Sequence, residues 1–290
     1  MMAGARGRKR PLRFTKMHGL GNDYVFVEAL RKRLPEASLP GLARRLSDRH
    51  FGIGGDGLIL VLPSRQAQFR MRIFNADGSE AEMCGNGIRM FAKYVYEHGL
   101  TRAKALDVET DAGMIRPRLT VRGGRVTSVR VDMGEPRLER AEIPMRGKPG
   151  RVIGETLRVG GERYAVTAVS MGNPHCVIFV KGADRFPVER VGPAIERHRA
   201  FPNRTNVEFA QVLKRSAIRM RVWERGAGET LACGTGACAT LVAAVLNGKA
   251  DRKATIHLLG GDLKVEWRES DNRVYMTGPA EEVFSGEVYV

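Results

Sequence analysis

The chain contains little cysteine and no long apolar run. Four of its 290 residues are cysteine, and none of them forms a C-x-x-C pair. This is too few for a disulfide scaffold and argues against a zinc or thioredoxin-like site, so we expect no metal and a reduced, cytoplasmic compartment. The N-terminal MMAGARGRKR lacks the apolar core of a signal peptide, and no segment approaches the length of a membrane span. We therefore expect no membrane association.

Positive charge, in contrast, is in excess. Lys and Arg number 48 against 32 Asp and Glu, which gives a formal net charge of +16. Apart from a cluster within residues 6–13, these charges are spread along the chain, and no basic motif is interleaved with aromatic residues. A basic nucleic-acid-binding protein is one alternative, but diffuse positive charge also serves solubility and attracts small anions. We expect no nucleic-acid partner and interpret residues 1–11 as a disordered basic arm.

The second half of the chain repeats the first. FRMRIFN at 69–75 and IRMRVWE at 218–224 both alternate apolar and polar residues, which predicts half-buried strands. The segment GSEAEMCGNGIR then faces AGETLACGTGAC at the same offset of 149 residues, so that Cys84 matches Cys233. Further upstream, GLGNDYVFV resembles MGNPHCVIFV, and residues 56–58 match 206–208. A register kept through so many segments predicts two domains of one architecture.

The predicted elements define a fold class. In each copy a helix follows the cysteine and ends at a glycine, Gly99 or Gly248. The second of these helices is apolar nearly all round, so its own sheet should enclose it. We predict an α+β protein of two pseudo-symmetric domains, each a curved, mostly antiparallel sheet wrapped around a central helix. The predicted domains are 12–134 with 279–290, and 135–278.

Each copy places a cysteine at the N-terminus of its central helix. Unpaired N–H groups and the helix dipole favour a thiolate there, and the adjacent glycines let an anion approach the backbone. If both helix starts face one cleft, one thiolate can remove a proton from an amino-acid Cα while the other thiol returns it on the opposite face. Backbone N–H groups from both helices would stabilise the carbanion through its carboxylate. The pattern predicts a two-base amino-acid epimerase that needs no cofactor.

The motifs also resemble those of a known family. FTKMHGLGNDYVFV, RHFGIGGDGLILV, FNADGSEAEMCGNGIRMFAKYV, GNPHCVIFV, RTNVEFAQV and VWERGAGETLACGTGACAT resemble diaminopimelate epimerase, from about residue 12 to the C-terminus. The resemblance implies that family's fold, a homodimer, and interconversion of LL- and meso-2,6-diaminopimelate without pyridoxal phosphate in lysine and peptidoglycan precursor biosynthesis. It also implies that Cys84 and Cys233 are the catalytic acid and base.

The resemblance further implies the residues that bind substrate. His175 and Glu224 would tune the pKa values of the cysteines, while Arg225 could pair with the distal carboxylate and Glu224 with the distal ammonium. The sequence departs from some relatives at Gly57, where they have Gln, so that a contact there would be lost or passed to water. The implied substrate-binding residues are Asn22, Asn75, Gly85, Asn86, Asn173, Asn206, Glu224, Arg225, Gly234 and Thr235.

One enzymatic alternative shares the fold and the two cysteines. A proline or hydroxyproline racemase-like enzyme would use the same pair, but Arg225, Asn75 and Asn206 argue against it because proline has no distal amino-acid head. Sequence leaves open which cysteine acts on which epimer, since a coupled pair shares its protons. The remaining cysteines, Cys176 and Cys238, are interpreted as inert packing.

Overall fold

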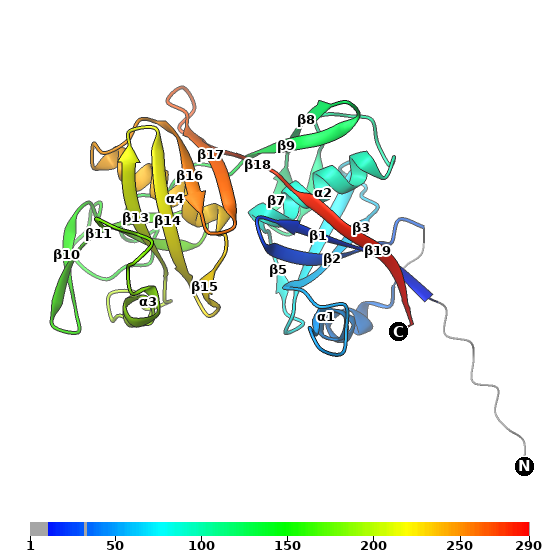
Figure 1. The fold of residues 1–290 in the computed structure, drawn as a ribbon, viewed down its shortest axis with the longest axis horizontal. Helices are drawn as coiled ribbons and strands as arrows, with labels where there is room; N and C mark the ends of the chain where they lie inside the picture. The colour runs from blue at the N-terminus through cyan, green and yellow to red at the C-terminus, as the bar shows by residue number, and fades with distance from the viewer. Residues whose placement is uncertain (1–10, 32–33, 290) are drawn as a thin grey trace, which may run out of the picture.

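The computed structural model describes residues 11–31 and 34–289, and they form two sheet-rich domains with the central helices α2 and α4 (Figure 1). The predicted α+β class with two similar, mostly antiparallel sheets is confirmed. Residues 1–10 of the predicted basic arm lie outside the described residues, and Pro11 already begins the first strand. The exact domain bounds stay a prediction.

The first sheet has eight strands in the order β19-β1-β2-β3-β4-β6-β7, with β5 paired to β4. All neighbours are antiparallel except β2 with β3 and β4 with β6. The strands are β1 (Pro11–Gly19), β2 (Asn22–Glu28), β3 (Gly57–Leu62), β4 (Phe69–Asn75), β5 (Glu80–Ala81), β6 (Val108–Thr110), β7 (Gly113–Ile115) and β19 (Glu281–Tyr289).

The second sheet has eleven strands in the order β10-β11-β12-β13-β14-β16-β17-β18-β9-β8, with β15 paired to β14. Its strands are β8 (Arg118–Arg122), β9 (Arg125–Asp132), β10 (Glu155–Val159), β11 (Glu162–Ser170), β12 (Pro174–Phe179), β13 (Asn206–Lys214), β14 (Ala217–Glu224), β15 (Gly228–Thr230), β16 (Lys253–Leu258), β17 (Gly261–Trp267) and β18 (Val274–Gly278). Although β8 and β9 join this sheet through β18, their side chains Leu119, Val126, Val129 and Val131 pack in the core around α2.

The central helices are α2 (Gly85–Glu97) and α4 (Gly234–Leu246), and the predicted glycine stops follow both of them. Gly99 and Gly248 have φ angles of 73° and 67°, which a glycine adopts at little cost. In α4 nearly every residue from Gly234 to Ala244 is buried, so the prediction of an enclosed helix is confirmed.

The sequence predicts one helix per domain, and this prediction is incomplete because the structure has further short helices. The short helix η1 (Glu36–Ser38) and α1 (Leu39–Ser47) lie between β2 and β3, and α3 (Val188–Glu196) lies between β12 and β13. Both strand pairs are parallel, and a parallel pair needs a crossover connection that a hairpin cannot supply. These short helices cover the face of each sheet that the central helix leaves free.

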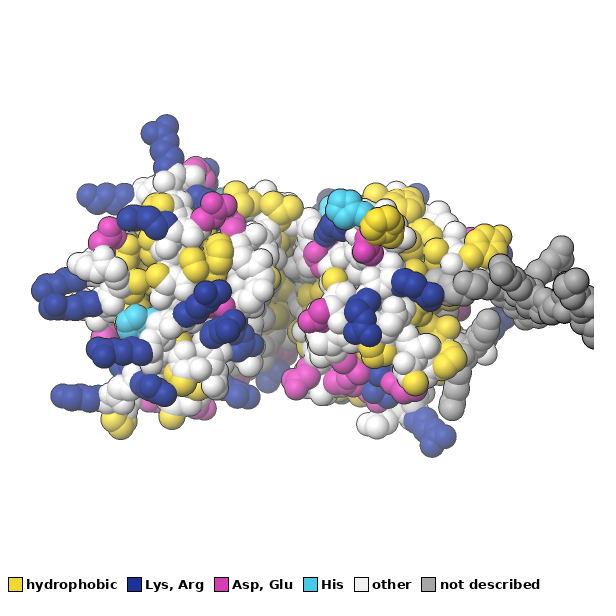
Figure 2. Space-filling model, turned by 90° about the horizontal axis from the view of Figure 1, so that it is seen from below, with side chains coloured by type: hydrophobic (Ala, Val, Ile, Leu, Met, Phe, Trp, Pro, Cys, Tyr) yellow, Lys and Arg dark blue, Asp and Glu magenta, His cyan; other side chains and the backbone are white. Residues whose placement is uncertain are grey.

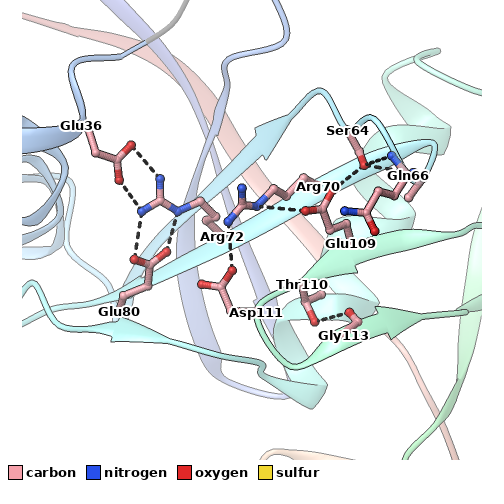
Figure 3. A network of polar contacts seen from close by, with 11 residues as sticks. Glu36, Ser64, Gln66, Arg70, Arg72, Glu80, Glu109, Thr110, Asp111 and Gly113 are labelled. Carbon is pink, nitrogen blue, oxygen red and sulfur yellow. Dashed lines mark hydrogen bonds and ion pairs between the residues drawn. The ribbon is translucent and has the colours of Figure 1, made fainter.

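On the N-terminal domain, two arginines of β4 hold neighbouring segments against the sheet (Figure 3). Arg72 pairs with Glu36 of η1 at 2.6 Å and with Glu80 of β5 at 2.5 Å. Arg70 pairs with Asp111, between β6 and β7, at 3.0 Å. Such pairs at the surface fix geometry more than they add stability.

The two domains are in contact at the turn between β1 and β2, where a leucine of the N-terminal domain inserts into the core of the C-terminal domain. Leu20 and Gly21 form the two-residue turn between β1 and β2 with φ angles of 59° and 87°, and positive φ at both positions is typical of a type I′ turn. A leucine rarely adopts this conformation. Its side chain is buried in the core around α4, which offsets that cost.

None of the helices in the described ranges has the length and apolar character required to cross a bilayer.

Candidate active site

The two matched cysteines occupy equivalent helix starts. Cys84 is the N-cap of α2 and its Sγ accepts a hydrogen bond from the Gly87 N–H at 3.3 Å. Cys233 is the N-cap of α4 and its Sγ accepts from the Gly236 N–H at 3.4 Å. Each sulfur therefore takes the place of a capping oxygen, and the predicted positions at the helix starts are confirmed.

The glycines three residues later allow each helix start to approach its sheet. A β-carbon at Gly87 would lie 3.1 Å from Ile59 of β3, and one at Gly236 would lie 2.8 Å from the carboxylate of Glu208 in β13. A larger residue at either position would displace the helix start from the strand. The two domains thus position their thiols in the same way.

Both helix starts open onto one cavity of about 880 Å³ between the domains, and the recess between the two lobes is visible in Figure 2. Its walls come from both lobes and include Cys84 and Cys233. Of the predicted substrate-binding residues, the lining contains Asn22, Asn75, Gly85, Asn86, Asn173, Glu224, Arg225, Gly234 and Thr235.

Two predicted residues lie behind the cavity wall. Asn206 is buried; its amide donates to the Pro174 carbonyl at 3.0 Å and accepts from the Arg225 backbone N–H at 2.9 Å. His175 is fully buried and lies 2.6 Å from Glu208 and 3.0 Å from the Asn173 side chain. The structure therefore places both residues where they orient cavity residues and do not contact the cavity themselves.

A chain of side-chain hydrogen bonds runs along the N-terminal wall. Arg89 donates to Asn86 at 2.8 Å, Asn86 donates to Asn22 at 3.2 Å, and Asn22 donates to Asp56 at 2.7 Å. Because a guanidinium only donates and a carboxylate only accepts, the two ends fix the orientation of both amides. The Asn22 carbonyl oxygen consequently faces Cys84, with its Oδ1 3.6 Å from Sγ.

The strand register relates the two thiol environments. The matched segments GLGNDYVFV and MGNPHCVIFV align Tyr24 with His175. In the sheets Tyr24 pairs with Gly57, and His175 pairs with Asn206. Asn206 therefore corresponds to Gly57 and not, as the sequence match of 56–58 with 206–208 predicted, to Asp56. By this register Tyr24 is the counterpart of His175.

The same register gives the second counterpart pair. It places Ile59 where the C-terminal domain has Glu208, and these two side chains are also the ones that approach Gly87 and Gly236. Equivalent positions behind the two helix starts thus hold a phenol and an alkyl group in one domain, and an imidazole and a carboxylate in the other.

These surroundings shift the thiol pKa values in ways that helix position alone did not predict. Burial raises the pKa of the Cys84 thiol, although N–H groups of Gly87 and Asn86, the Tyr24 hydroxyl and Arg89 oppose the rise. Burial raises the pKa of the Cys233 thiol well above its usual range, and the carboxylates of Glu224 and Glu208 raise it further. The expectation that the helix N-termini would lower both values was wrong, because desolvation outweighs the helix dipole here.

Steric crowding explains why position 57 is a glycine. A β-carbon at this position would lie 2.2 Å from the Phe74 carbonyl oxygen and 2.8 Å from the Tyr24 ring. A glutamine would therefore require the strand to shift, and the contact inferred from some relatives has no room in this chain.

Several polar residues around the thiols were not predicted from the sequence. Tyr24 lines the cavity with its hydroxyl 4.0 Å from Cys84 Sγ. Arg89 and Glu208 are buried behind the wall, and Asp56 is partly exposed and accepts a hydrogen bond from Asn22. Tyr24 could have been found from its alignment with His175 in the repeat. Arg89 could have been found from its place one turn after Gly85, in an otherwise apolar stretch of helix.

Comparisons with known proteins agree with this geometry. The profile of the family described as Diaminopimelate epimerase matches residues 14–139 and 167–283. The diaminopimelate epimerase of Moorella thermoacetica is 63% identical over 276 residues, covering 95% of this chain and 99% of that protein. That of Pelotomaculum thermopropionicum is 62% identical, covering 95% and 98%.

Solved structures show the same fold at low sequence identity. A phenazine biosynthesis protein of the PhzF family from Bacillus anthracis has a TM-score of 0.72 at 17% identity, over 97% of this chain and 100% of that one. A hydroxyproline epimerase from Agrobacterium vitis has a TM-score of 0.68 at 15% identity, over 97% and 93%. With two relatives above 60% identity over nearly their whole length, the chain belongs to the diaminopimelate epimerase family.

Proposed function

We propose that this protein interconverts LL- and meso-2,6-diaminopimelate in lysine and peptidoglycan precursor biosynthesis, with Cys84 and Cys233 as the two acid/base groups. One observation carries the proposal: two cysteines that cap the central helices of similar domains line the same cavity. One thiolate removes the Cα proton, the opposite thiol delivers a proton to the other face, and the centre is inverted. The scheme calls for no cofactor.

Binding of the reacting carboxylate is the main task of the helix starts. The first N–H groups of a helix have no helical partner, and here they belong to Gly85, Asn86, Gly234 and Thr235. Two sets of donors that converge on one carboxylate would stabilise the carbanion as charge moves into it. Thr235 is held in place by the Asn173 amide, which donates to its hydroxyl at 3.3 Å.

The raised thiol pKa values suit a weak carbon acid. A thiolate with a high pKa is a stronger base than an ordinary one, and proton transfer follows base strength. Burial in the cavity therefore lowers the fraction of each cysteine that is ionised, but it increases the base strength of the thiolate that forms. The two effects oppose each other, and closure of the domains around substrate would exclude water that competes for the proton.

The distal amino-acid head would be bound at the end of β14. Arg225 and Glu224 line the cavity there, and Arg225 is held by its guanidinium hydrogen bond to the Asn203 carbonyl at 3.2 Å. Glu224 accepts from Thr230 at 2.5 Å, and burial raises its pKa. Its carboxylate also raises the pKa of Cys233, so Glu224 would serve both the distal ammonium and the thiol.

Isotope exchange tests the two-base scheme. In deuterated water, label should enter the product epimer well before it enters recovered substrate, because the proton delivered comes from a group that did not remove the first one. Early time points analysed by mass spectrometry measure this directly. Label that enters substrate and product equally from the first turnovers would indicate a single base and contradict the proposal.

Substrate specificity is tested by comparing amino acids that do and do not carry a second α-amino acid group. We expect turnover of LL-diaminopimelate and none of L-proline or trans-4-hydroxy-L-proline, which have nothing to pair with Arg225. Turnover of the proline substrates alone would replace the proposal with the racemase alternative.

We further propose that the protein forms a homodimer through the edge strand β19. Val283, Phe284 and Tyr289 on this strand are 55%, 48% and 68% exposed, and an edge strand that carries exposed apolar side chains is a ready pairing surface. Val283→Asp should shift the sedimentation coefficient from that of a dimer to that of a 32.0 kDa monomer. A wild-type protein that sediments as a monomer at micromolar concentration would contradict this proposal.

Working thiols require reduction, and the described cysteines are free. We propose that the enzyme acts in the reducing cytoplasm, where its activity does not need added reductant.

A further inference from the structure

A buried arginine next to the active site has no use in the scheme above. Arg89 is 0% exposed in the first turns of α2, and burying a charged group without a counter-charge is costly. It donates to the carbonyl oxygens of Pro279 and Gly85 at 3.1 and 3.0 Å, and to Asn86 at 2.8 Å. Within the described part of the chain, no carboxylate forms an ion pair with it.

The surroundings of Arg89 show why its charge remains. Burial lowers its pKa to about 10, which leaves the group charged at neutral pH. The acidic groups with which it interacts are the thiols of Cys84 and Cys238. Cys238 lies inside an apolar helix with a pKa raised to about 12, so it stays neutral. A thiolate at Cys84 is therefore the local anion that this cation can balance.

The charged groups that face Cys84 differ from those that face Cys233. Around Cys84, Tyr24 of β2 and Arg89 of α2 both lower the thiol pKa, while Asp56, behind Asn22, acts on Tyr24. Other charged residues on the shared cavity wall are Glu82, Arg116, Asp132, Glu224, Arg225 and Arg273. Around Cys233, the carboxylates of Glu224 and Glu208 oppose ionisation. The named neighbours of Cys84 thus favour its ionisation against the effect of burial, whereas the carboxylates near Cys233 add to that effect.

Arg89 also fixes the geometry between the two domains. Its side chain fills the space between the end of β1, where a β-carbon at Gly19 would lie 3.2 Å from it, and the end of β18, where one at Gly278 would lie 3.3 Å from it. Through Asn86 it reaches the Ala232 carbonyl, at 3.3 Å, which immediately precedes Cys233. The cation is therefore held rigidly, as preorganised electrostatic stabilisation requires.

We propose that Arg89 is a positioning residue that supplies the fixed positive charge of the reaction centre, so that Cys84 ionises before Cys233. The inference deepens the proposed function and rests on it for its catalytic meaning. It assigns Cys84 as the cysteine that loses its proton first, while Cys233 is still a thiol.

The test measures Cys84 ionisation without any substrate. The rate of Cys84 alkylation by iodoacetamide is followed against pH by peptide mass spectrometry, in wild type, Arg89→Met and Arg89→Lys. We expect the midpoint of Arg89→Met to rise by about one pH unit or more, since a close opposite charge shifts a pKa by this amount. Arg89→Lys, which keeps the charge, should recover most of that shift. The epimerase kcat should fall at least tenfold in Arg89→Met and recover in part with lysine.

Arg70→Met is the matched control, because it removes an arginine of the same domain from ion pairs outside the cavity (Figure 3). It should leave both the alkylation midpoint and kcat within about twofold of wild type. Equal losses in Arg89→Met and Arg89→Lys with an unchanged midpoint would show a purely structural role and overturn the proposal.

A second measurement covers the case in which Arg89→Met does not fold. In the wild-type protein, Cys84 should be alkylated at a lower pH than Cys233, and the reverse order would overturn the proposal. A wild-type protein that shows the expected midpoints but no epimerase activity would refute the proposed function and leave the assignment of Arg89 intact.

Discussion

Replacing either Cys84 or Cys233 with alanine is expected to abolish epimerisation, with kcat at least about a hundredfold and up to roughly ten-thousandfold below wild type. Each thiol works on one face of the Cα, so the remaining one cannot invert the centre in either direction. The measurement is conversion of LL- to meso-diaminopimelate by each purified variant, under reducing conditions. A single-alanine variant within tenfold of wild type would refute the role assigned to that cysteine.

Cys238→Ala provides the control for this experiment. It removes a thiol from the same helix as Cys233, five residues further on and enclosed in the core. The loss of one buried sulfur should cost about 1 kcal/mol of stability and leave kcat unchanged. If Cys238→Ala were as inactive as Cys233→Ala, loss of core packing and not loss of an acid or base would explain both.

Gly260→Ala is expected to lower kcat/KM about a hundredfold by forcing the domains apart. Its β-carbon would lie 2.0 Å from the Leu20 carbonyl oxygen, a backbone atom that cannot move alone. Leu20 and Gly21 directly precede Asn22, so the turn would carry this cavity residue away from Cys84 by about an ångström, and errors of this size cost about two orders of magnitude. Steady-state kinetics on diaminopimelate measures the loss.

Gly182→Ala is the matched variant for that comparison. Both glycines belong to the C-terminal domain, both have φ outside the left-handed region, and a β-carbon at Gly182 would meet no atom within 4 Å. We expect Gly182→Ala to retain wild-type kcat/KM. Wild-type kinetics in Gly260→Ala would show that the contact between Gly260 and Leu20 does not set the geometry of the cavity.

Sequence was most informative where two copies of one pattern could be compared. The matched cysteines, the strands FRMRIFN and IRMRVWE, and the glycine stops of both helices appear where the repeat predicts them, because period, cap and turn are local properties. The helices α1 and α3 were missed because the need for them arises from parallel strand pairing, which is not local.

The features that were predicted less well depend on tertiary packing, which the local sequence does not reveal. Burial raises the pKa values of both Cys84 and Cys233, and the carboxylates of Glu224 and Glu208, which the fold brings close, raise that of Cys233 further. Leu20 lies in a turn of the N-terminal domain, and its local sequence does not indicate that it is buried in the core of the other domain. The assignment of Asn206 to Asp56 failed by one residue because a sequence match does not fix the register of a strand.

The way the chain passes between its domains restricts how the cavity can open. It leaves the N-terminal domain after β9 and returns after β18, and these two strands are paired, with Tyr275 opposite Asp132 and Gly278 opposite Val129. Both crossings therefore lie on one two-stranded ribbon (Figure 1). We expect the lobes to swing about this ribbon as a single axis, so that opening of the domains widens the mouth of the cavity.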